Sequence, residues 1–142
     1  MSRRNAREQA LVLLYQCDLR KKQPDVIWNE FRSFYAPEEE GAIPLEEQDF
    51  TFIHHELTGV WNRLNDIDQT IGRNSRRWEI GRLSAPLRAI LRIAVYEIHY
   101  CDDIPNVVSI NEAVELAKGY DSPEAGAFVN GILAGVLREM KE

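Results

Sequence analysis

The sequence predicts an all-helical protein. Apolar residues recur at three- and four-residue spacing along most of the chain, and almost no stretch alternates apolar and polar residues as a strand does. Typical helix-start signals precede several of these periodic stretches, most clearly Ser84-Ala85-Pro86 and Asp121-Ser122-Pro123-Glu124. Of the 142 residues, 44% are hydrophobic, yet no apolar run approaches the ~20 residues of a membrane span. We therefore expect about seven helices around a true core.

Four helices are expected in the first half of the chain. The first runs from about Arg3 to Leu19, the second begins at Pro24, a third follows an acidic loop at residues 36–45, and a fourth covers roughly Leu64 to Ile71. The positions that should face the core are Ala6, Ala10, Leu13, Leu14 and Cys17 in the first helix, Val26, Ile27, Phe31 and Phe34 in the second, and Phe50, Ile53, Leu57, Val60 and Trp61 in the third.

Three helices are expected in the second half. The helix from Leu87 to Tyr100 is apolar almost all round, which predicts a central buried helix that includes Leu91. Ser109-Ile110-Asn111-Glu112 has the form of a capping box and should open the next helix, through Ala117. The last helix contributes Phe128 to the core, and its Gly131 and Gly135, one turn apart, predict a close helix approach. We expect one domain over residues 1–142, with helical subdomains at about 1–79 and 80–142.

Charge is distributed unevenly along this acidic chain of net charge −6. Residues 1–22 hold six Lys/Arg against two Asp/Glu, and residues 73–92 hold six against one. Residues 23–72 hold two against eleven, and residues 93–142 hold three against nine. Two basic islands between acidic stretches favour a confined anion-binding site, and the acidic remainder leaves surface for a basic protein partner.

The arginine-rich start of the first helix is the best candidate for such a site. Arg3 and Arg7 are one turn apart and Arg4 and Arg7 are i,i+3 neighbours, so the three could act on one ligand. Arg4 shares a stripe with Leu11 and Tyr15, and an aromatic ring on a cationic flank suits single-stranded nucleic acid. An ordinary helix start with solvated arginines is an equal alternative on these residues alone.

Other constellations are weaker. Arg76 and Arg77, beside Trp78, could extend an RNA-binding track, whereas we favour a structural role for Arg88 and Arg92. His54-His55-Glu56 lacks the second His at i+4 that a zinc site on a helix needs, so we expect no metal site there. The sequence contains no nucleophile–base set and no glycine-rich phosphate loop, and we expect neither catalysis nor a cofactor. Cys17 and Cys101 are interpreted as reduced core thiols of a cytoplasmic protein.

Several motifs occur in a specific order along the chain: Ala6-Arg7-Glu8, then Leu87 to Ile98 with its Tyr96-Glu97 pair, Asp103-Ile104-Pro105, Ile110 to Lys118 with its Asn111-Glu112-Ala113 start, and Phe128-Val129-Asn130-Gly131-Ile132-Leu133. On these motifs the whole chain resembles the NusB family of bacterial transcription antitermination factors. The resemblance implies two packed helical bundles. It also implies binding of the boxA element of nascent ribosomal RNA.

The resemblance further implies a protein partner, NusE, which is also a small-subunit ribosomal protein. The pair would join RNA polymerase with other Nus factors and suppress termination. The family's arginine-rich N-terminus corresponds to Arg3, Arg4 and Arg7 here, and the family's aromatic residue near the end of the first helix corresponds to Tyr15.

Two alternatives to an antitermination factor are retained. NusB-like domains also precede ribosomal-RNA cytosine methyltransferases, although a chain that ends at residue 142 leaves no room for a cofactor-binding domain. The other alternative is a helical adaptor that binds only protein.

Overall fold

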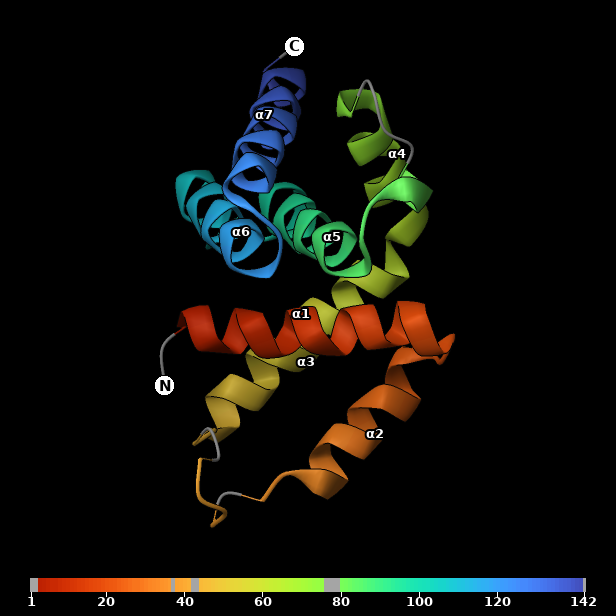
Figure 1. The fold of residues 1–142 in the computed structure, drawn as a ribbon, viewed down its shortest axis with the longest axis vertical. Helices are drawn as coiled ribbons and strands as arrows, with labels where there is room; N and C mark the ends of the chain where they lie inside the picture. The colour runs from red at the N-terminus through yellow and green to blue at the C-terminus, as the bar shows by residue number, and fades with distance from the viewer. Residues whose placement is uncertain (1–2, 37, 42–43, 76–79, 142) are drawn as a thin grey trace.

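The computed structural model describes residues 3–36, 38–41, 44–75 and 80–141, and all regular secondary structure within these ranges is helical (Figure 1). The elements are α1 (Arg3–Arg20), α2 (Pro24–Phe34), α3 (Glu47–Asn62), α4 (Leu64–Asn74), the short 3-10 turn η1 (Ile80–Arg82), α5 (Ala85–Tyr100), α6 (Asn106–Tyr120) and α7 (Pro123–Met140). The predicted all-helical class and the seven expected helices are confirmed. None of the helices in the described ranges is long and apolar enough to cross a lipid bilayer.

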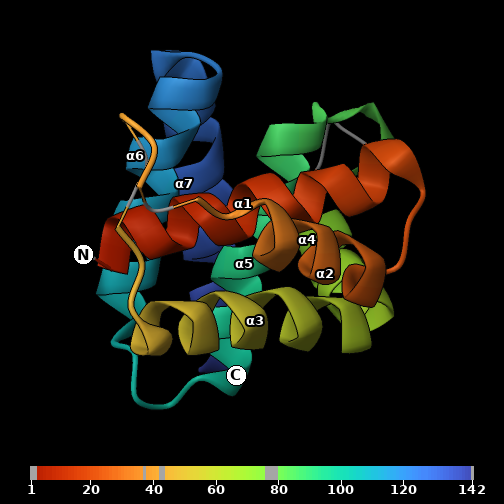
Figure 2. The ribbon, with the colours of Figure 1, turned by 90° about the horizontal axis from the view of Figure 1, so that it is seen from below.

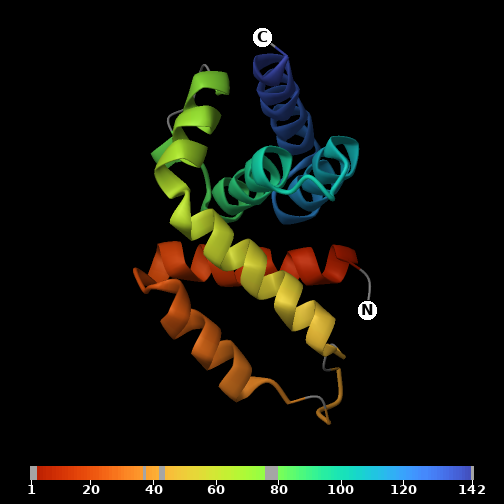
Figure 3. The same ribbon diagram turned by 180° about the vertical axis from the view of Figure 1, so that it is seen from behind.

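Helix α1 crosses the middle of the molecule and lies between two groups of helices. Helices α2 and α3 pack on one side of α1, and α5 packs on the other side with α6 and α7 beyond it (Figure 1). The view from behind shows α3 running diagonally across α1 (Figure 3), and the view from below shows α2 lying between α1 and α3 over part of their length (Figure 2). The contacts that α1 makes on both sides join the two groups into one packed unit.

Helix α4 packs chiefly against α5 and α7, although it follows α3 directly in the chain. Arg73 and Asn74, in its last turn, hydrogen-bond to Glu139 of α7. By contact, α4 therefore belongs with the later helices. We propose that the chain forms two helical subdomains. The packing of α4 supports a boundary between them at the junction of α3 and α4, instead of the predicted boundary near residue 80.

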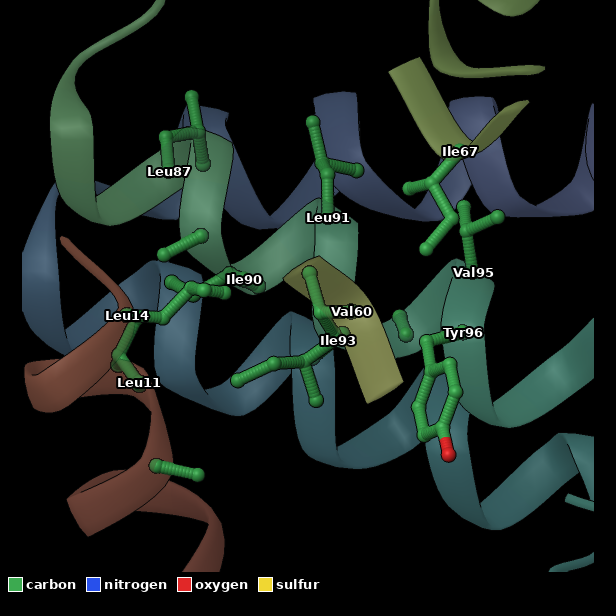
Figure 4. Packing of buried hydrophobic residues seen from close by; sticks show 14 of the residues in the cluster. Leu11, Leu14, Val60, Ile67, Leu87, Ile90, Leu91, Ile93, Val95 and Tyr96 are labelled. Atoms are coloured by element: carbon green, nitrogen blue, oxygen red, sulfur yellow. The ribbon is translucent and has the colours of Figure 1, made fainter. Parts of the chain in front are cut away.

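Helix α5 forms the centre of the core, as its sequence predicts. Every residue from Ala89 to Ile98 is buried, and Leu91 is 0% exposed. Leu11 and Leu14 of α1 point toward Ile90 of α5 in Figure 4. One continuous hydrophobic cluster thus extends from α1 through α5 to the later helices, and it includes both buried cysteines.

Two helix starts follow the predicted capping chemistry and one does not. The hydroxyl oxygens of Ser84 and Ser122 accept hydrogen bonds from the backbone N–H groups of Leu87 and Ala125, and a proline follows each serine within two residues. The predicted capping box at Ser109 is wrong, because α6 already begins at Asn106. Ser109 lies buried within α6, where its hydroxyl donates a hydrogen bond to the buried carboxylate of Glu97 on α5.

The apolar face of α2 is narrower than its sequence suggests. Ile27 is 1% exposed as expected, but Val26 is 39% exposed and Phe34 is 81% exposed. Helix α2 packs mainly on α1 and α3, so only the side of α2 that carries Ile27, Trp28 and Phe31 meets the core. The prediction that Val26 and Phe34 are core residues is therefore wrong; Phe34 lies at the rim of a surface groove between α1 and α2.

The two glycines of α7 have different surroundings. A Cβ atom added at Gly135 would overlap the side chain of Asn74, so here α4 and α7 approach closely, as predicted. A Cβ atom added at Gly131 would meet no other atom within 4 Å, and for this residue the prediction of a close approach is wrong.

Candidate nucleic-acid interface

Two exposed arginines occupy the first turn of α1. The guanidinium carbon of Arg3 lies 4.1 Å from the centroid of the Phe52 ring on α3, a cation–π contact. Arg4 donates from Nε to Oε2 of Glu112 on α6 at 2.7 Å. The first turn contains no acidic residue, and the positive end of the helix dipole adds to the potential there. Neighbouring helices thus hold two cationic side chains at one end of α1.

The ion pair of Arg4 with Glu112 leaves Arg4 available to a ligand. The Arg4 side chain is 57% exposed, and exposed ion pairs typically contribute only ~0–1 kcal/mol to stability. A phosphate group could replace the Glu112 carboxylate as the partner of Arg4 with little loss of free energy, because both groups present negatively charged oxygen acceptors. Arg3 already has its guanidinium beside an aromatic face and needs no other partner to hold it there.

Arg7 does not belong to this exposed pair. Its side chain is buried, and it donates to Glu97 of α5 through Nε to Oε2 at 2.9 Å and through Nη2 to Oε1 at 3.0 Å. The Ser109 hydroxyl donates to the same carboxylate at 2.8 Å. Both interpretations of Arg7 from the sequence, a ligand contact beside Arg3 and Arg4 or a solvated charge, require an exposed side chain, and the burial of Arg7 contradicts that exposure. One turn into the helix, the same face of α1 has already met α3 and α5.

Tyr15 is half-buried and packs against the core, further along α1 than the exposed arginines. It is eleven residues from Arg4, which corresponds to ~16 Å along a helix axis. Leu11, on the same predicted stripe, is 0% exposed, so the stripe is not a continuous surface. An RNA would have to extend over several nucleotides to reach both Arg4 and Tyr15.

A shallow groove lies between α1 and α6 next to Arg4. It has a volume of about 350 Å³ and is lined by Arg4, Glu8, Glu115, Leu116, Gly119 and Tyr120. The Tyr120 hydroxyl donates to Oε1 of Glu8 at 2.8 Å, which places a second, partly exposed aromatic ring beside the arginine end of α1. This ring was not among the predicted site residues, because its role depends on how α6 crosses α1.

Sequence comparison shows which family has this architecture. The family model described as "NusB family" matches residues 4–138. The chain belongs to the NusB family. It is 40% identical to the transcription antitermination protein NusB of Symbiobacterium thermophilum, covering 99% of this chain and 92% of the relative. It is 39% identical to the protein of the same name from Desulforamulus reducens, covering 100% of this chain and 94% of the relative.

Solved structures agree with the family assignment. A NusB structure from T. maritima matches with a TM-score of 0.82 and 31% identity, covering 98% of this chain and 92% of that one. A crystal structure of antitermination factors NusB and NusE in complex with dsRNA matches with a TM-score of 0.81 and 26% identity, covering 96% of both chains. The fold inferred from the family resemblance is thereby confirmed.

Two other predicted arginines of this NusB-family chain are engaged within the fold. Arg92 is buried and donates from Nε to Asp68 of α4 at 2.8 Å and from Nη1 to Asp18 of α1 at 3.2 Å. Arg88 donates from Nε to the same Asp18 oxygen at 2.7 Å. This network ties α1, α4 and α5 together and supports the structural role that we favoured for both arginines.

The other residues singled out in the sequence add nothing to the interface within the described parts of the chain. Arg76 and Arg77 lie outside the described residues. His54 packs against Trp28, with ring centroids 4.8 Å apart, and His55 lies against Tyr96. Among the residues that the structure describes, no three His, Cys, Asp or Glu side chains are grouped closely enough to hold a metal ion.

Sequence reasoning missed three residues that shape the interface. Phe52 supports Arg3, Glu112 holds Arg4, and Glu97 removes Arg7 from the surface. A signal for Glu97 was present, because a carboxylate inside an otherwise apolar helix needs a buried cationic partner. The identity of that partner depends on the crossing of α1 and α5.

Proposed function

We propose that this chain binds the boxA element of nascent ribosomal RNA together with NusE, and thereby helps RNA polymerase to read through terminators. The observation that carries the proposal is the exposed Arg3–Arg4 pair in the first turn of α1, on a chain whose net charge is −6. An acidic protein binds RNA only where positive charge is concentrated. The matching structure with NusE and dsRNA supports the choice of ligand and partner.

The proposed interface combines cations with flanking rings. Arg3 and Arg4 would contact phosphates, while Tyr120 in the neighbouring groove and Tyr15 further along α1 offer ring faces to unpaired bases. Phosphate contacts position the RNA, and sequence preference has to come from the bases. The chain supplies few groups for base recognition, so a second protein that completes the RNA surface explains how specificity arises.

Binding of RNA and NusE should be thermodynamically coupled. NusE would occupy a separate, largely acidic surface and add basic residues beside the same RNA. Each ligand would then raise the affinity for the other by the same factor, and a coupling of ~1–3 kcal/mol is expected. Isothermal titration around the full cycle measures this coupling. Equal RNA affinity with and without saturating NusE would contradict the shared surface and leave a simple RNA-binding module.

A filter-binding comparison tests the function itself. The protein is titrated into boxA RNA and into a scrambled RNA of the same composition, each with and without NusE. The proposal predicts preference for boxA, and a larger preference when NusE is present. Identical affinity for both RNAs under all conditions would contradict it, and no RNA binding at all would favour a protein-only adaptor.

We propose a non-enzymatic, cytoplasmic role, since the process proposed here takes place where bacterial RNA is made. A module that serves a ribosomal-RNA methyltransferase would also bind RNA. The relatives from S. thermophilum and D. reducens are both named transcription antitermination proteins, which favours the role in transcription.

A further inference from the structure

A second carboxyl group is buried beside the Arg7–Glu97 pair. Glu56 lies on α3, one turn after Phe52, and is 1% exposed. Neither of its side-chain oxygens accepts a hydrogen bond from any group in the described parts of the chain. An ionised carboxylate without donors is very unfavourable in a protein interior, whereas a neutral carboxylic acid needs only an acceptor for its proton.

The groups that face Glu56 supply such an acceptor. Glu97 of α5 is its neighbouring carboxylate, Arg7 and Arg3 of α1 lie within electrostatic reach of it, and Tyr96 and Cys101 are its titratable neighbours at the end of α5. The hydrogen bonds that Arg7 makes go to Glu97, which also receives the Ser109 proton. Glu97 thus accepts the hydrogen bonds of Arg7 and Ser109, whereas no such donor reaches the oxygens of Glu56.

These surroundings favour the protonated form of Glu56. Burial raises the pKa of Glu56 well above its usual value, and the neighbouring Glu97 carboxylate raises it further. The charges of Arg7 and Arg3 act in the opposite direction and are smaller causes. Because the Arg7 guanidinium bonds to Glu97 and not to Glu56, ionising both neighbouring carboxyl groups is unfavourable.

We propose that Glu56 is a neutral carboxylic acid in the folded protein and that it donates its proton to Glu97. This hydrogen bond joins α3 to the Arg7–Glu97 pair at the point where α1 crosses α3. Glu56 is thus a positioning residue, since the same stretch of α3 carries the Phe52 ring beneath Arg3. The inference concerns the folded protein alone and stands whether or not the chain binds RNA.

The proposal has a definite consequence for stability. In the unfolded chain Glu56 loses its proton at the ordinary glutamate pKa of ~4.3, whereas in the folded chain it keeps the proton to higher pH. The stabilising contribution of this group is therefore complete below the unfolded pKa. It is lost as pH rises toward the folded pKa, at about tenfold in the folding equilibrium constant per pH unit.

Glu56→Gln tests this consequence, because an amide resembles the neutral acid but does not titrate. Denaturant unfolding is measured from pH 4.5 upward for the wild type, Glu56→Gln and a control, Glu47→Gln, which removes an 86%-exposed charge from the same helix. The folding constant of Glu56→Gln relative to wild type should rise about tenfold per pH unit above the ordinary glutamate pKa. The control ratio should stay nearly flat.

A spectroscopic measurement on the wild type keeps the test independent of the folding of the variant. Carbon-13 NMR of glutamate-labelled protein should show a Glu56 carboxyl resonance that does not titrate near pH 4.3, and infrared spectra at neutral pH should show the carbonyl stretch of an un-ionised acid. A Glu56 resonance that titrates normally, with no such infrared band, would overturn the proposal. A flat stability ratio for Glu56→Gln would do the same.

Discussion

Arg7 and Glu97 are ninety residues apart in the chain and form a buried, doubly hydrogen-bonded ion pair at the crossing of α1 and α5. This pair separates the arginines at the start of α1 into two kinds. Arg3 and Arg4 remain at the surface, where they can meet RNA, whereas Arg7 fixes the helix that presents them.

Replacing Arg7 with alanine should destabilise the fold by about 3–5 kcal/mol, because Glu97 would remain buried without its cationic partner. Arg4→Ala is the matched control, and it should change the free energy of unfolding by no more than about 1 kcal/mol, since the Arg4 ion pair is exposed. Denaturant unfolding of both variants measures the difference. Equally small changes in the free energy of unfolding for both variants would mean that the Arg7–Glu97 pair does not stabilise the crossing of α1 and α5.

The loss of folding stability on truncating a core side chain to alanine should increase with how deeply that side chain is buried. Leu91→Ala removes a fully buried side chain of α5 and should cost about 2–5 kcal/mol. Phe128 of α7 is only partly buried, so Phe128→Ala should cost less than the 3–5 kcal/mol typical of buried phenylalanines. Thermal unfolding of the two variants gives the order, and a larger loss for Phe128→Ala would show that the core is centred elsewhere.

The two glycines of α7 should respond oppositely to alanine. Gly131→Ala should stabilise the protein by about 1 kcal/mol, because alanine favours the helix and the new methyl group has free space. Gly135→Ala should lose this gain or destabilise, since its methyl group displaces Asn74, which bonds to Thr70 and Glu139. The same shift in melting temperature for both variants would contradict the close packing of α4 on α7.

Much of the fold could be predicted from the sequence because its signals are local. The spacing of apolar residues identified all seven helices, and Ser84 and Ser122 cap as predicted. Local signals gave the wrong prediction where the environment of a residue depends on packing against another helix. Ser109 resembles a cap but serves a buried carboxylate, and Phe34 continues an apolar stripe beyond the point where α1 and α3 cover it.

The candidate site was predictable only in part for the same reason. Arg3 and Arg4 are exposed as their position at the helix start suggests. Arg7 is buried because it pairs with Glu97, and Arg3 is held over the ring of Phe52. Glu97 and Phe52 both come from distant parts of the sequence. Helical periodicity alone cannot show that a face with arginines at one end is buried one turn later.

The salt dependence of boxA RNA binding tests the central claim most directly. Affinities are measured over a range of salt concentrations for the wild type, for Arg3→Ala/Arg4→Ala, and for the control Arg32→Ala/Arg63→Ala, which removes two exposed arginines that also lie over aromatic rings. Each phosphate contact with single-stranded RNA contributes about 0.7 to the slope of log affinity against log salt. We predict weaker binding and a slope shallower by about 1.4 for the Arg3/Arg4 variant, and wild-type behaviour for the control. Unchanged affinity and slope in a well-folded Arg3/Arg4 variant would contradict the account.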